Sequence, residues 1–325
     1  MHDNKYLLIC CFALILFAIT ARHTKIREVI QTHSTGSVAH TAKYDSDIDE
    51  TILIKDETAV VPAANVTATT TVEEKKPRPY ITAESYLVGN LETGELYIDF
   101  NSSRIFPIAS VSKLYTALVV QHLMDEDKQI TITQPMLDAY GDAGHLALDE
   151  KFTSSELLYP LLLESSNDAA EAFAQSYGYQ DFMAEMNGFA KEIGLEKTSF
   201  RDASGLSPSN VSNAADLFTL TQYLYGHEMD ILKFSRTPIY DLATTTEHNG
   251  HHLVNINPYS AYSNFVGGKT GRTDEAREAM ISLFRQEIGR ETYPIAIILL
   301  RSDFGQREID TEKLLGLFIE KTGKK

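Results

Sequence analysis

Three short strings along this chain contain residue types that support acyl transfer through a serine. They are Ser110-Val111-Ser112-Lys113, Ser165-Ser166-Asn167 and Lys269-Thr270-Gly271. Taken alone, the first string is usually a helix cap followed by a solvated lysine, and the second is usually a helix cap. Taken together in this order, they predict a nucleophilic serine, a lysine that acts as its base and a second lysine that binds an anionic substrate group.

The first string predicts a hydroxyl beside an amine. Ser110 opens a run with apolar residues at helical spacing, which places it at a helix N-terminus and Lys113 one turn further on. Residues at this spacing have Cβ atoms about 5–6 Å apart, so the amine of Lys113 can reach the Ser110 hydroxyl. A lysine acts as a base only with a low pKa, and burial, the positive end of a helix and a second cation all lower it. We expect Lys269 to be that second cation.

The second string lies between two apolar helical runs, so it is predicted to form a short turn that projects its side chains into a cleft. From there Ser165 is expected to relay a proton between Lys113 and the leaving group. The amide of Asn167 has both a donor and an acceptor, and we expect it to bind the peptide link of the substrate.

The third string ends a predicted strand that contains Gly267, Gly268 and Gly271. Glycines allow a peptide to lie close against the backbone, so the substrate is expected to add to this strand. Lys269 and Thr270 would then bind its terminal carboxylate.

The residue after the third string is expected to complete an oxyanion hole. The backbone N–H of Arg272 would pair with that of Ser110, and each such donor contributes about 10²- to 10³-fold in rate. The same tripeptide recurs as Lys321-Thr322-Gly323, close to the end of the sequence. Strand and helix patterns follow only the first copy, so we expect only that copy to lie within a sheet.

The elements that must position these strings begin near Tyr80. A first hairpin is predicted from strands at 86–89 and 96–100. Helices are predicted at 110–124, 154–163, 168–177, 181–193 and 213–225, with Pro160 kinking the second of them. Later strands are predicted at 239–245, 252–256, 265–270, 279–284 and 295–300, followed by a helix at 307–321. Strands at both chain ends with helices between them predict an α/β fold whose sheet is built from both ends, with a helical subdomain.

The N-terminal part of the chain is predicted to be a membrane anchor and a linker. Residues 6–20 carry no charge, which matches a signal-peptide core and is somewhat shorter than a full span of about 20 residues. Residues 1–21 are therefore expected to be an export signal or an anchor, and retention is favoured because Ile19 does not suit cleavage after Ala21. Residues 22–79 have the composition of a flexible linker, and residues 80–325 form the expected folded domain. The protein is thus expected outside the cytoplasm, anchored or secreted.

Composition excludes several other classes of function. A net charge of −16 over 325 residues argues against a nucleic-acid partner, which would need clustered Lys and Arg. Both cysteines, Cys10 and Cys11, lie in the apolar segment, so the predicted domain has neither a disulfide nor a thiolate nucleophile. Three histidines flank Asn249-Gly250, and we predict a solvated hairpin turn there rather than a metal site: His248, His251 and His252.

The three strings in this order resemble those of penicillin-binding proteins and serine β-lactamases. Their spacing, with Ser165 55 residues after Ser110 and Lys269 104 residues after Ser165, resembles that of the penicillin-binding group. Two further stretches are similar to the D-alanyl-D-alanine carboxypeptidases of low molecular mass. They are Gly194-Leu195-Glu196-Lys197-Thr198-Ser199-Phe200 with Ser204-Gly205-Leu206, and Lys269-Thr270-Gly271-Arg272-Thr273-Asp274. The resemblance covers about residues 85–321.

This resemblance implies a β-lactamase/transpeptidase-like antiparallel sheet and an acyl-enzyme on Ser110. It implies hydrolysis of the terminal D-Ala of peptidoglycan stem peptides, β-lactams as covalent inhibitors, and neither a metal nor an organic cofactor. Arg277 replaces a glycine that often follows the third motif in this family, which leaves the start of the next strand open. The β-rich second domain and C-terminal anchor of many relatives are not expected here, so anchoring falls to the N-terminal segment.

Three alternatives remain open from the sequence. A β-lactamase of class A needs a deacylating glutamate, and the neighbourhood of residues 200–203 contains no Glu-x-x-Leu-Asn string. A DD-endopeptidase that cleaves cross-links would use the same three strings. A membrane-tethered peptidoglycan-binding protein without turnover is the non-enzymatic alternative, although all the expected catalytic side chains are present.

Overall fold

The computed structural model describes residues 79–141 and 143–323. The predicted anchor, residues 1–21, and all but the last residue of the predicted linker lie outside this part of the chain. Within it, no helix combines the length and the apolar composition needed to cross a membrane.

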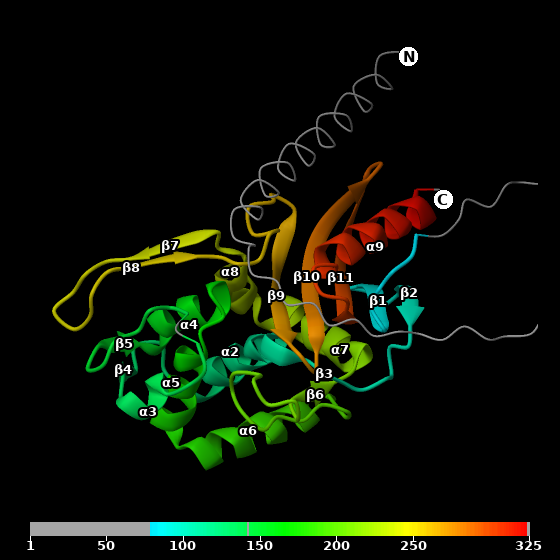
Figure 1. Ribbon diagram of the computed structural model, residues 1–325. Coiled ribbons are helices and arrows are strands. Elements are labelled where there is room, and N and C mark those ends of the chain that lie inside the picture. The colour runs from blue at the N-terminus through cyan, green and yellow to red at the C-terminus, as the bar shows by residue number, and fades with distance from the viewer. Residues whose placement is uncertain (1–78, 142, 324–325) are drawn as a thin grey trace, which may run out of the picture. The chain divides into compact units, whose positions relative to one another are not determined.

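A five-stranded antiparallel sheet forms the centre of the described domain, with strand order β2-β1-β11-β10-β9 (Figure 1). Its strands are β1 Ser85–Asn90, β2 Leu96–Phe100, β9 Phe265–Thr273, β10 Arg277–Ile288 and β11 Glu291–Ser302. The first two come from one end of the domain sequence and the last three from the other. They join where β1 pairs with β11, with Ser85 opposite Leu300. The predicted α/β fold with a sheet built from both chain ends is confirmed.

Both faces of the sheet are buried, and its strands alternate between two apolar clusters. Met280 and Phe284 of β10 pack with Leu314 and Phe318 of the C-terminal helix α9, Arg307–Thr322. Their neighbour Ile281 belongs to the larger cluster on the opposite face. Because successive side chains point to opposite faces, a strand covered on both sides becomes apolar at nearly every position.

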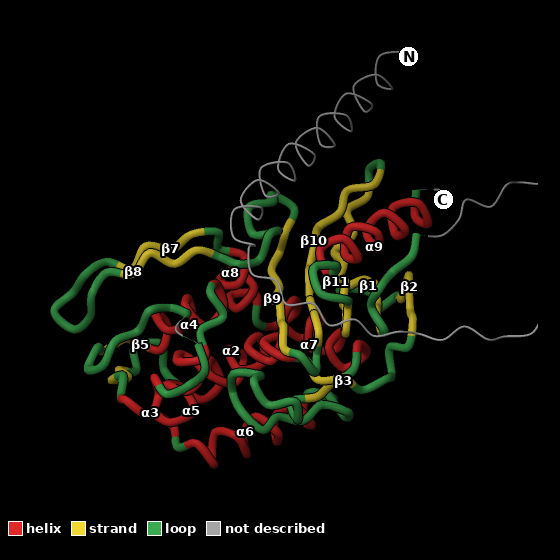
Figure 2. Tube along the Cα trace, viewed as in Figure 1, coloured by secondary structure: helices red, strands yellow, loops and turns green. Residues whose placement is uncertain are grey.

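The helices of the opposite face form the predicted helical subdomain (Figure 2). They are η1 Ala109–Val111, α2 Ser112–Leu123, α3 Gln134–Leu137, α4 Ser154–Leu163, α5 Asn167–Tyr177, α6 Tyr179–Glu192, α7 Ala214–His227 and α8 Met229–Arg236. Short antiparallel pairs accompany them: β3 Phe106–Pro107 with β6 Val211–Ser212, β4 Gln129–Thr131 with β5 Lys151–Thr153, and β7 Ile239–Leu242 with β8 His251–Val254.

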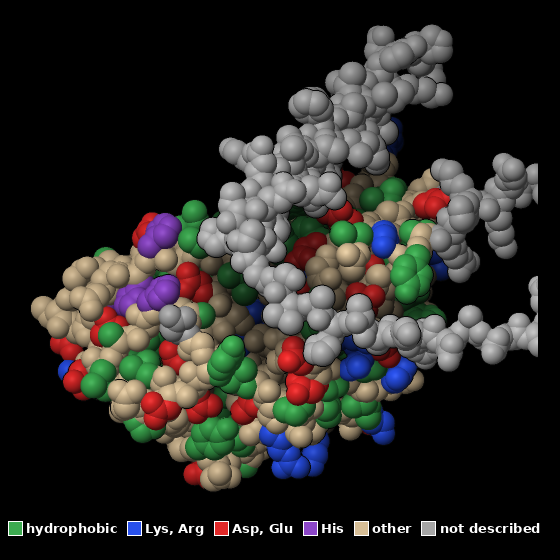
Figure 3. All heavy atoms as spheres, viewed as in Figure 1, with side chains coloured by type: hydrophobic (Ala, Val, Ile, Leu, Met, Phe, Trp, Pro, Cys, Tyr) green, Lys and Arg blue, Asp and Glu red, His purple; other side chains and the backbone are tan. Residues whose placement is uncertain are grey.

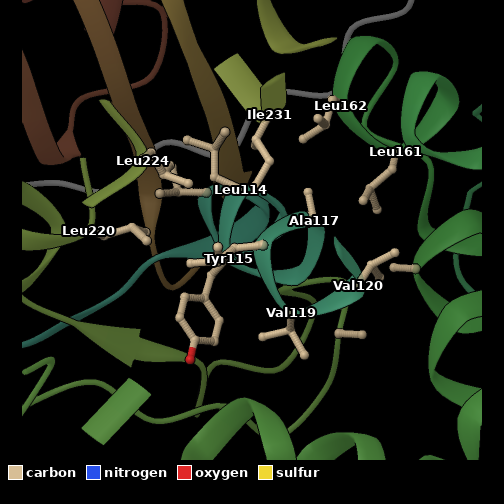
Figure 4. Close-up of a cluster of buried hydrophobic side chains, with 14 of the residues drawn as sticks. Leu114, Tyr115, Ala117, Val119, Val120, Leu161, Leu162, Leu220, Leu224 and Ile231 are labelled. Carbon is tan, nitrogen blue, oxygen red and sulfur yellow. The ribbon is translucent and has the colours of Figure 1, made fainter. Parts of the chain in front are cut away.

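Helix α2 is the central element of this subdomain. Every residue from Ser112 to Val120 is buried, and Figure 4 shows its apolar side chains among those of α4, α7 and α8. A helix that is apolar on all sides has to be enclosed by other elements. This enclosure is what removes the side chain of Lys113 from water.

The predicted elements are present and one helix end is misplaced, but the helices α3 and α8 and the short strands β3, β4, β5 and β6 were not predicted. The helix predicted at 213–225 is longer in the structure, because α7 continues through Gly226 to His227 and is capped by Glu228, which has non-helical φ and ψ angles of −130° and 49°. A glycine inside a helix costs only about 1 kcal/mol, so it does not by itself terminate one. The missed helices α3 and α8 are short, and too few residues show their periodicity.

The sequence left open where the strand after the third string begins, because Arg277 replaces a glycine there. Arg277 has φ 51°, in the left-handed region that favours glycine, and β10 begins at this residue. Its guanidinium lies 2.9 Å from the carboxylate of Asp303. Arg277 thus adopts a left-handed backbone conformation that would cost a glycine little, and its side chain forms an ion pair that glycine could not form.

The predicted solvated turn is wrong for two of the three histidines. His248 is 6% exposed and stacks on Phe152 with ring centroids 4.6 Å apart, and the side chain of His251 is 7% exposed. Only His252 faces solvent, beside Asp241. The hairpin is held on β5, whose Lys151 N–H donates to the carbonyl of Glu247. Figure 3 shows histidine side chains gathered on the β7–β8 side of the molecule.

Candidate active site

Ser110 and Lys113 lie at the start of α2, as the sequence predicts. Ser110 is in the short helix η1, which leads directly into α2, and Ala109 before it has φ 48°. The Nζ of Lys113 lies 3.0 Å from the Ser110 Oγ. The lysine side chain is completely buried, so this contact is shielded from water.

The contacts of the Lys113 Nζ determine whether an N–H group or the lone pair faces Ser110. Besides Ser110, its Nζ contacts the Oδ1 of Asn167 at 2.7 Å and the carbonyl oxygen of Ser204 at 2.5 Å. Both of these oxygens can only accept hydrogen bonds. An uncharged amine has two N–H groups and one lone pair, so the two oxygens use both N–H groups. The lone pair is then directed at the Ser110 hydroxyl, which is the arrangement that a general base needs.

Burial lowers the pKa of Lys113 to about 7. The carboxylate of Asp202 acts in the opposite direction and raises it, because an opposite charge favours the protonated amine. A neighbouring cation was expected to lower the pKa of Lys113, but this effect is resolved on the pKa of Lys269 instead. The pKa of that lysine is held well below its ordinary value by burial first, and then by the charges of Lys113 and Arg307.

The second string forms a tight turn between α4 and α5. Ser165 has φ 65°, and its Oγ accepts a hydrogen bond of 2.9 Å from the Nζ of Lys269. Ser166 caps α5 through the N–H of Ala169. Asn167 is the first residue of α5, and its Nδ2 donates to the carbonyl of Tyr140. The turn thus brings Asn167 to Lys113 and Ser165 to Lys269.

Strand β9 is an edge strand of the sheet and carries the third string along its free side. The N–H of Gly268 points away from β10 and donates to the Ser235 Oγ on α8 at 3.1 Å. Backbone groups alternate in direction along a strand, so Thr270 and Arg272 direct their N–H groups to that same free edge. A peptide that adds to β9 would therefore pair with Thr270 and Arg272.

Gly271 permits a close contact between β9 and the segment that carries the serine. A Cβ atom at this position would lie 2.9 Å from the carbonyl oxygen of Ile108 and 3.1 Å from the backbone N of Ser110. This contact brings the backbone of Ser110 beside that of Gly271 and Arg272. The second tripeptide lies elsewhere: Lys321 is in the last turn of α9, as expected for a copy outside the sheet.

Two contributors to the site were not predicted from the sequence. The Ser204 carbonyl is aimed at Lys113 by a loop in which Asp202 accepts the N–H groups of Ser204, Gly205 and Ser207. The string Ser204-Gly205-Leu206 pointed to this loop but not to its role. Arg307 begins α9, and its Nη1 lies 3.4 Å from the carbonyl oxygen of Gly271. It belongs to no motif, so no sequence signal identified it.

The site therefore combines a serine, two buried lysines of lowered pKa and the guanidinium of Arg307. A guanidinium keeps its charge in proteins, which suits a substrate with a carboxylate although the chain carries a net charge of −16. The described residues contain no group of three or more His, Cys, Asp or Glu side chains arranged to hold a metal ion. This fold and this arrangement define a serine hydrolase of the acyl-transferring DD-peptidase type.

Comparison with known proteins identifies the family. The peptidase family S11, described as D-alanyl-D-alanine carboxypeptidase, matches residues 69–292, and the chain belongs to this family. The D-alanyl-D-alanine endopeptidase of Escherichia coli is 30% identical over 256 residues, which cover 74% of this chain and 78% of that protein. The D-alanyl-D-alanine carboxypeptidase DacF of Bacillus subtilis is 28% identical over 242 residues, covering 72% of this chain and 61% of that protein.

A solved structure shows the same fold. Penicillin-binding protein D2 of Listeria monocytogenes, in its ampicillin-bound form, superposes with a TM-score of 0.64 and 31% identity. The match covers 75% of this chain and 99% of that one. The family match and these relatives confirm the predicted family, fold class, hydrolase activity and D-Ala-D-Ala carboxypeptidase function.

Proposed function

We propose that this chain removes the terminal D-Ala from peptidoglycan stem peptides through a covalent acyl-enzyme on Ser110. Lys113 takes the proton of the Ser110 hydroxyl, and the Oγ attacks the carbonyl carbon of the penultimate D-Ala. The bond to the terminal D-Ala breaks as its nitrogen accepts, through the hydroxyl of Ser165, the proton that Lys113 took from Ser110. Water then cleaves the acyl ester, which releases the shortened peptide and restores the serine.

The observation that carries this proposal is the set of hydrogen bonds around Lys113. The carbonyls of Asn167 and Ser204 occupy both N–H groups of the uncharged amine and leave its lone pair to Ser110. General-base catalysis is most effective when the pKa of the base is near the working pH, and a pKa of about 7 meets this condition.

The substrate would lie along the free edge of β9. The N–H groups of Ser110 and Arg272 form the oxyanion hole in this proposal, and the Asn167 amide binds the peptide link. Lys269, Thr270 and Arg307 bind the terminal carboxylate beyond the scissile bond. An incoming carboxylate is an opposite charge for Lys269 and raises its low pKa, so binding favours the protonated lysine.

β-Lactams are expected to acylate the same serine. The Listeria monocytogenes protein that shares this fold contains ampicillin in its solved structure, and both β-lactams and the proposed substrate carry a carboxylate beside an acyl-transferring carbonyl. The enzyme is proposed to act outside the cytoplasm, tethered through residues 1–21, in which the uncharged run 6–20 suits a membrane anchor.

Muropeptides of defined structure test the proposed reaction. The full chain is incubated with uncross-linked pentapeptides and with cross-linked dimers, and Ser110→Ala serves as the inactive control. We expect release of free D-Ala from the pentapeptide. Cleavage of dimers without D-Ala release would overturn the carboxypeptidase proposal in favour of an endopeptidase, the activity named for the relative from Escherichia coli. Binding of both muropeptides without turnover would indicate the non-catalytic alternative.

The Asn167→Asp exchange is expected to move the pH dependence of acylation upward. The rate rises with pH as Lys113 loses its proton, with a midpoint near its pKa of about 7. A carboxylate at position 167 would lie beside the Nζ, now 2.7 Å from the Asn167 Oδ1, and a nearby opposite charge raises a lysine pKa by about 1–3 units. Rates of labelling by a fluorescent penicillin measured across pH check this. Asn167→Ala is the uncharged control, and an equal midpoint in the two variants would contradict the prediction.

A further inference from the structure

The side chain of Glu164, directly before Ser165, is held by two separate segments of the chain. Glu164 follows the last residue of α4 and is half-buried. Its Oε2 accepts the N–H of Gly144 at 3.0 Å, and its Oε1 accepts the N–H of Val254 at 3.0 Å. One carboxylate thus joins the loop before β5 and the end of β8 to the start of the turn between α4 and α5.

The turn that follows Glu164 has an unfavourable conformation that needs such support. Ser165 is a non-glycine residue with φ 65°, and residues in this region persist only where the surrounding structure determines their conformation. Two backbone hydrogen bonds help to hold the turn, from Ser166 N–H to the Pro160 carbonyl at 2.9 Å and from Ile256 N–H to the Leu163 carbonyl at 3.0 Å. The carboxylate of Glu164 adds two hydrogen bonds from a side chain that hold the start of the turn.

The loop that Glu164 binds also contacts Asn167, the other side chain of the turn that belongs to the site. Gly144 packs so closely that a Cβ atom there would lie 2.8 Å from the Pro160 Cβ and 3.1 Å from the Ser166 Oγ. In the same loop, the carbonyl of Tyr140 accepts the Nδ2 of Asn167 at 2.6 Å. This contact orients the amide, because the Nδ2 is used by Tyr140 and the Oδ1 is left for Lys113.

We propose that Glu164 is a positioning residue, which holds the turn so that Ser165 meets Lys269 and Asn167 meets Lys113. The inference rests on the proposed function, in which Ser165 and Asn167 take part in acylation. It requires two acceptor oxygens at position 164, one for each backbone N–H group. A carboxylate has two, whereas a glutamine amide has one acceptor and presents N–H donors at the other position.

Full-chain variants at position 164 test this role through the rate of acylation by a fluorescent penicillin. We expect Glu164→Ala to lower the acylation rate about 10²-fold, the size expected when reacting groups are misplaced by about 1 Å. Glu164→Gln keeps one acceptor and is expected to show a smaller loss. The matched control is Glu156→Gln at the other end of α4, where the carboxylate accepts hydrogen bonds from Thr153. That exchange is expected to lower the melting temperature of the protein without slowing acylation.

A mutant cycle separates positioning from a general loss of structure. If Glu164 acts through the turn, its replacement in a background with both Ser165→Ala and Asn167→Ala is expected to cost about 10-fold or less, because coupled residues are not additive. An undiminished loss in that background would overturn the positioning role, as would normal acylation by Glu164→Ala when Ser165→Ala alone is slow. Normal acylation by Ser165→Ala itself would instead overturn the proposed function of that serine, and with it the positioning of Ser165 by Glu164.

Discussion

Replacing Ser110 by alanine is expected to abolish covalent labelling by a fluorescent penicillin and to lower D-Ala release by about 10⁶-fold, the loss seen when a serine nucleophile is removed. The physical reason is that the acyl-enzyme can form only on the Ser110 Oγ, which is the hydroxyl that faces the lone pair of Lys113 at 3.0 Å. Gel fluorescence measures the labelling, and muropeptide digestion measures the D-Ala release.

The neighbouring serine provides a matched control for this result. Ser112 is also buried, but its Oγ donates to the carbonyl of Ala109 and accepts from Asn210, so it has a structural role. Ser112→Ala is expected to cost about 1 kcal/mol of stability, as for the loss of a buried hydrogen bond, and to keep its labelling. Labelling of Ser110→Ala, or its loss in Ser112→Ala alone, would place the nucleophile elsewhere.

The exchange Lys113→Ala is expected to lower turnover by at least about 10³-fold through the loss of general-base catalysis. Two effects act together, because the Ser110 proton loses its acceptor and the carbonyls of Asn167 and Ser204 lose their donor. Single-turnover measurement of acylation at neutral pH gives the loss, and the melting temperature shows whether the variant is folded.

A second exchange at this position separates charge from basicity. Lys113→Arg keeps a cation, but a guanidinium does not release its proton in proteins and so cannot act as the base. We therefore expect it to be as inactive as Lys113→Ala. A rate near that of the unmodified protein in either folded variant would mean that another group deprotonates Ser110.

Residues that act over short sequence distances were predicted correctly. The contact between Ser110 and Lys113 follows from helical spacing, because two side chains one turn apart must meet on the same face. The strands and most helices also follow from local periodicity. The second tripeptide was also correctly predicted to lie outside the sheet, since its Lys321 is in α9 and donates to the carbonyl of Tyr97.

Groups brought together over long sequence distances were predicted less well. Arg307, the Ser204 carbonyl and the Glu164 carboxylate contribute through contacts with segments that no local pattern identifies. Lys269 was expected to lower the pKa of Lys113, whereas the charge effect resolved between the two lysines lowers the pKa of Lys269, and the one resolved on Lys113 comes from Asp202 and raises its pKa. The burial of His248 and His251 was missed because it depends on the packing of the hairpin against β5 and Phe152.

The amino-acid sequence by itself determined the chemical groups of this site, the order in which they occur and the elements that carry them. Residue type and periodicity are local properties, and they are sufficient to predict a serine, its lysine and a glycine-rich edge strand. Tertiary structure alone decided that Lys113 is enclosed, which carbonyls use its N–H groups and which lysine meets Ser165. Those features depend on burial and on hydrogen bonds between distant segments, because only the packed chain excludes water and sets the final distances.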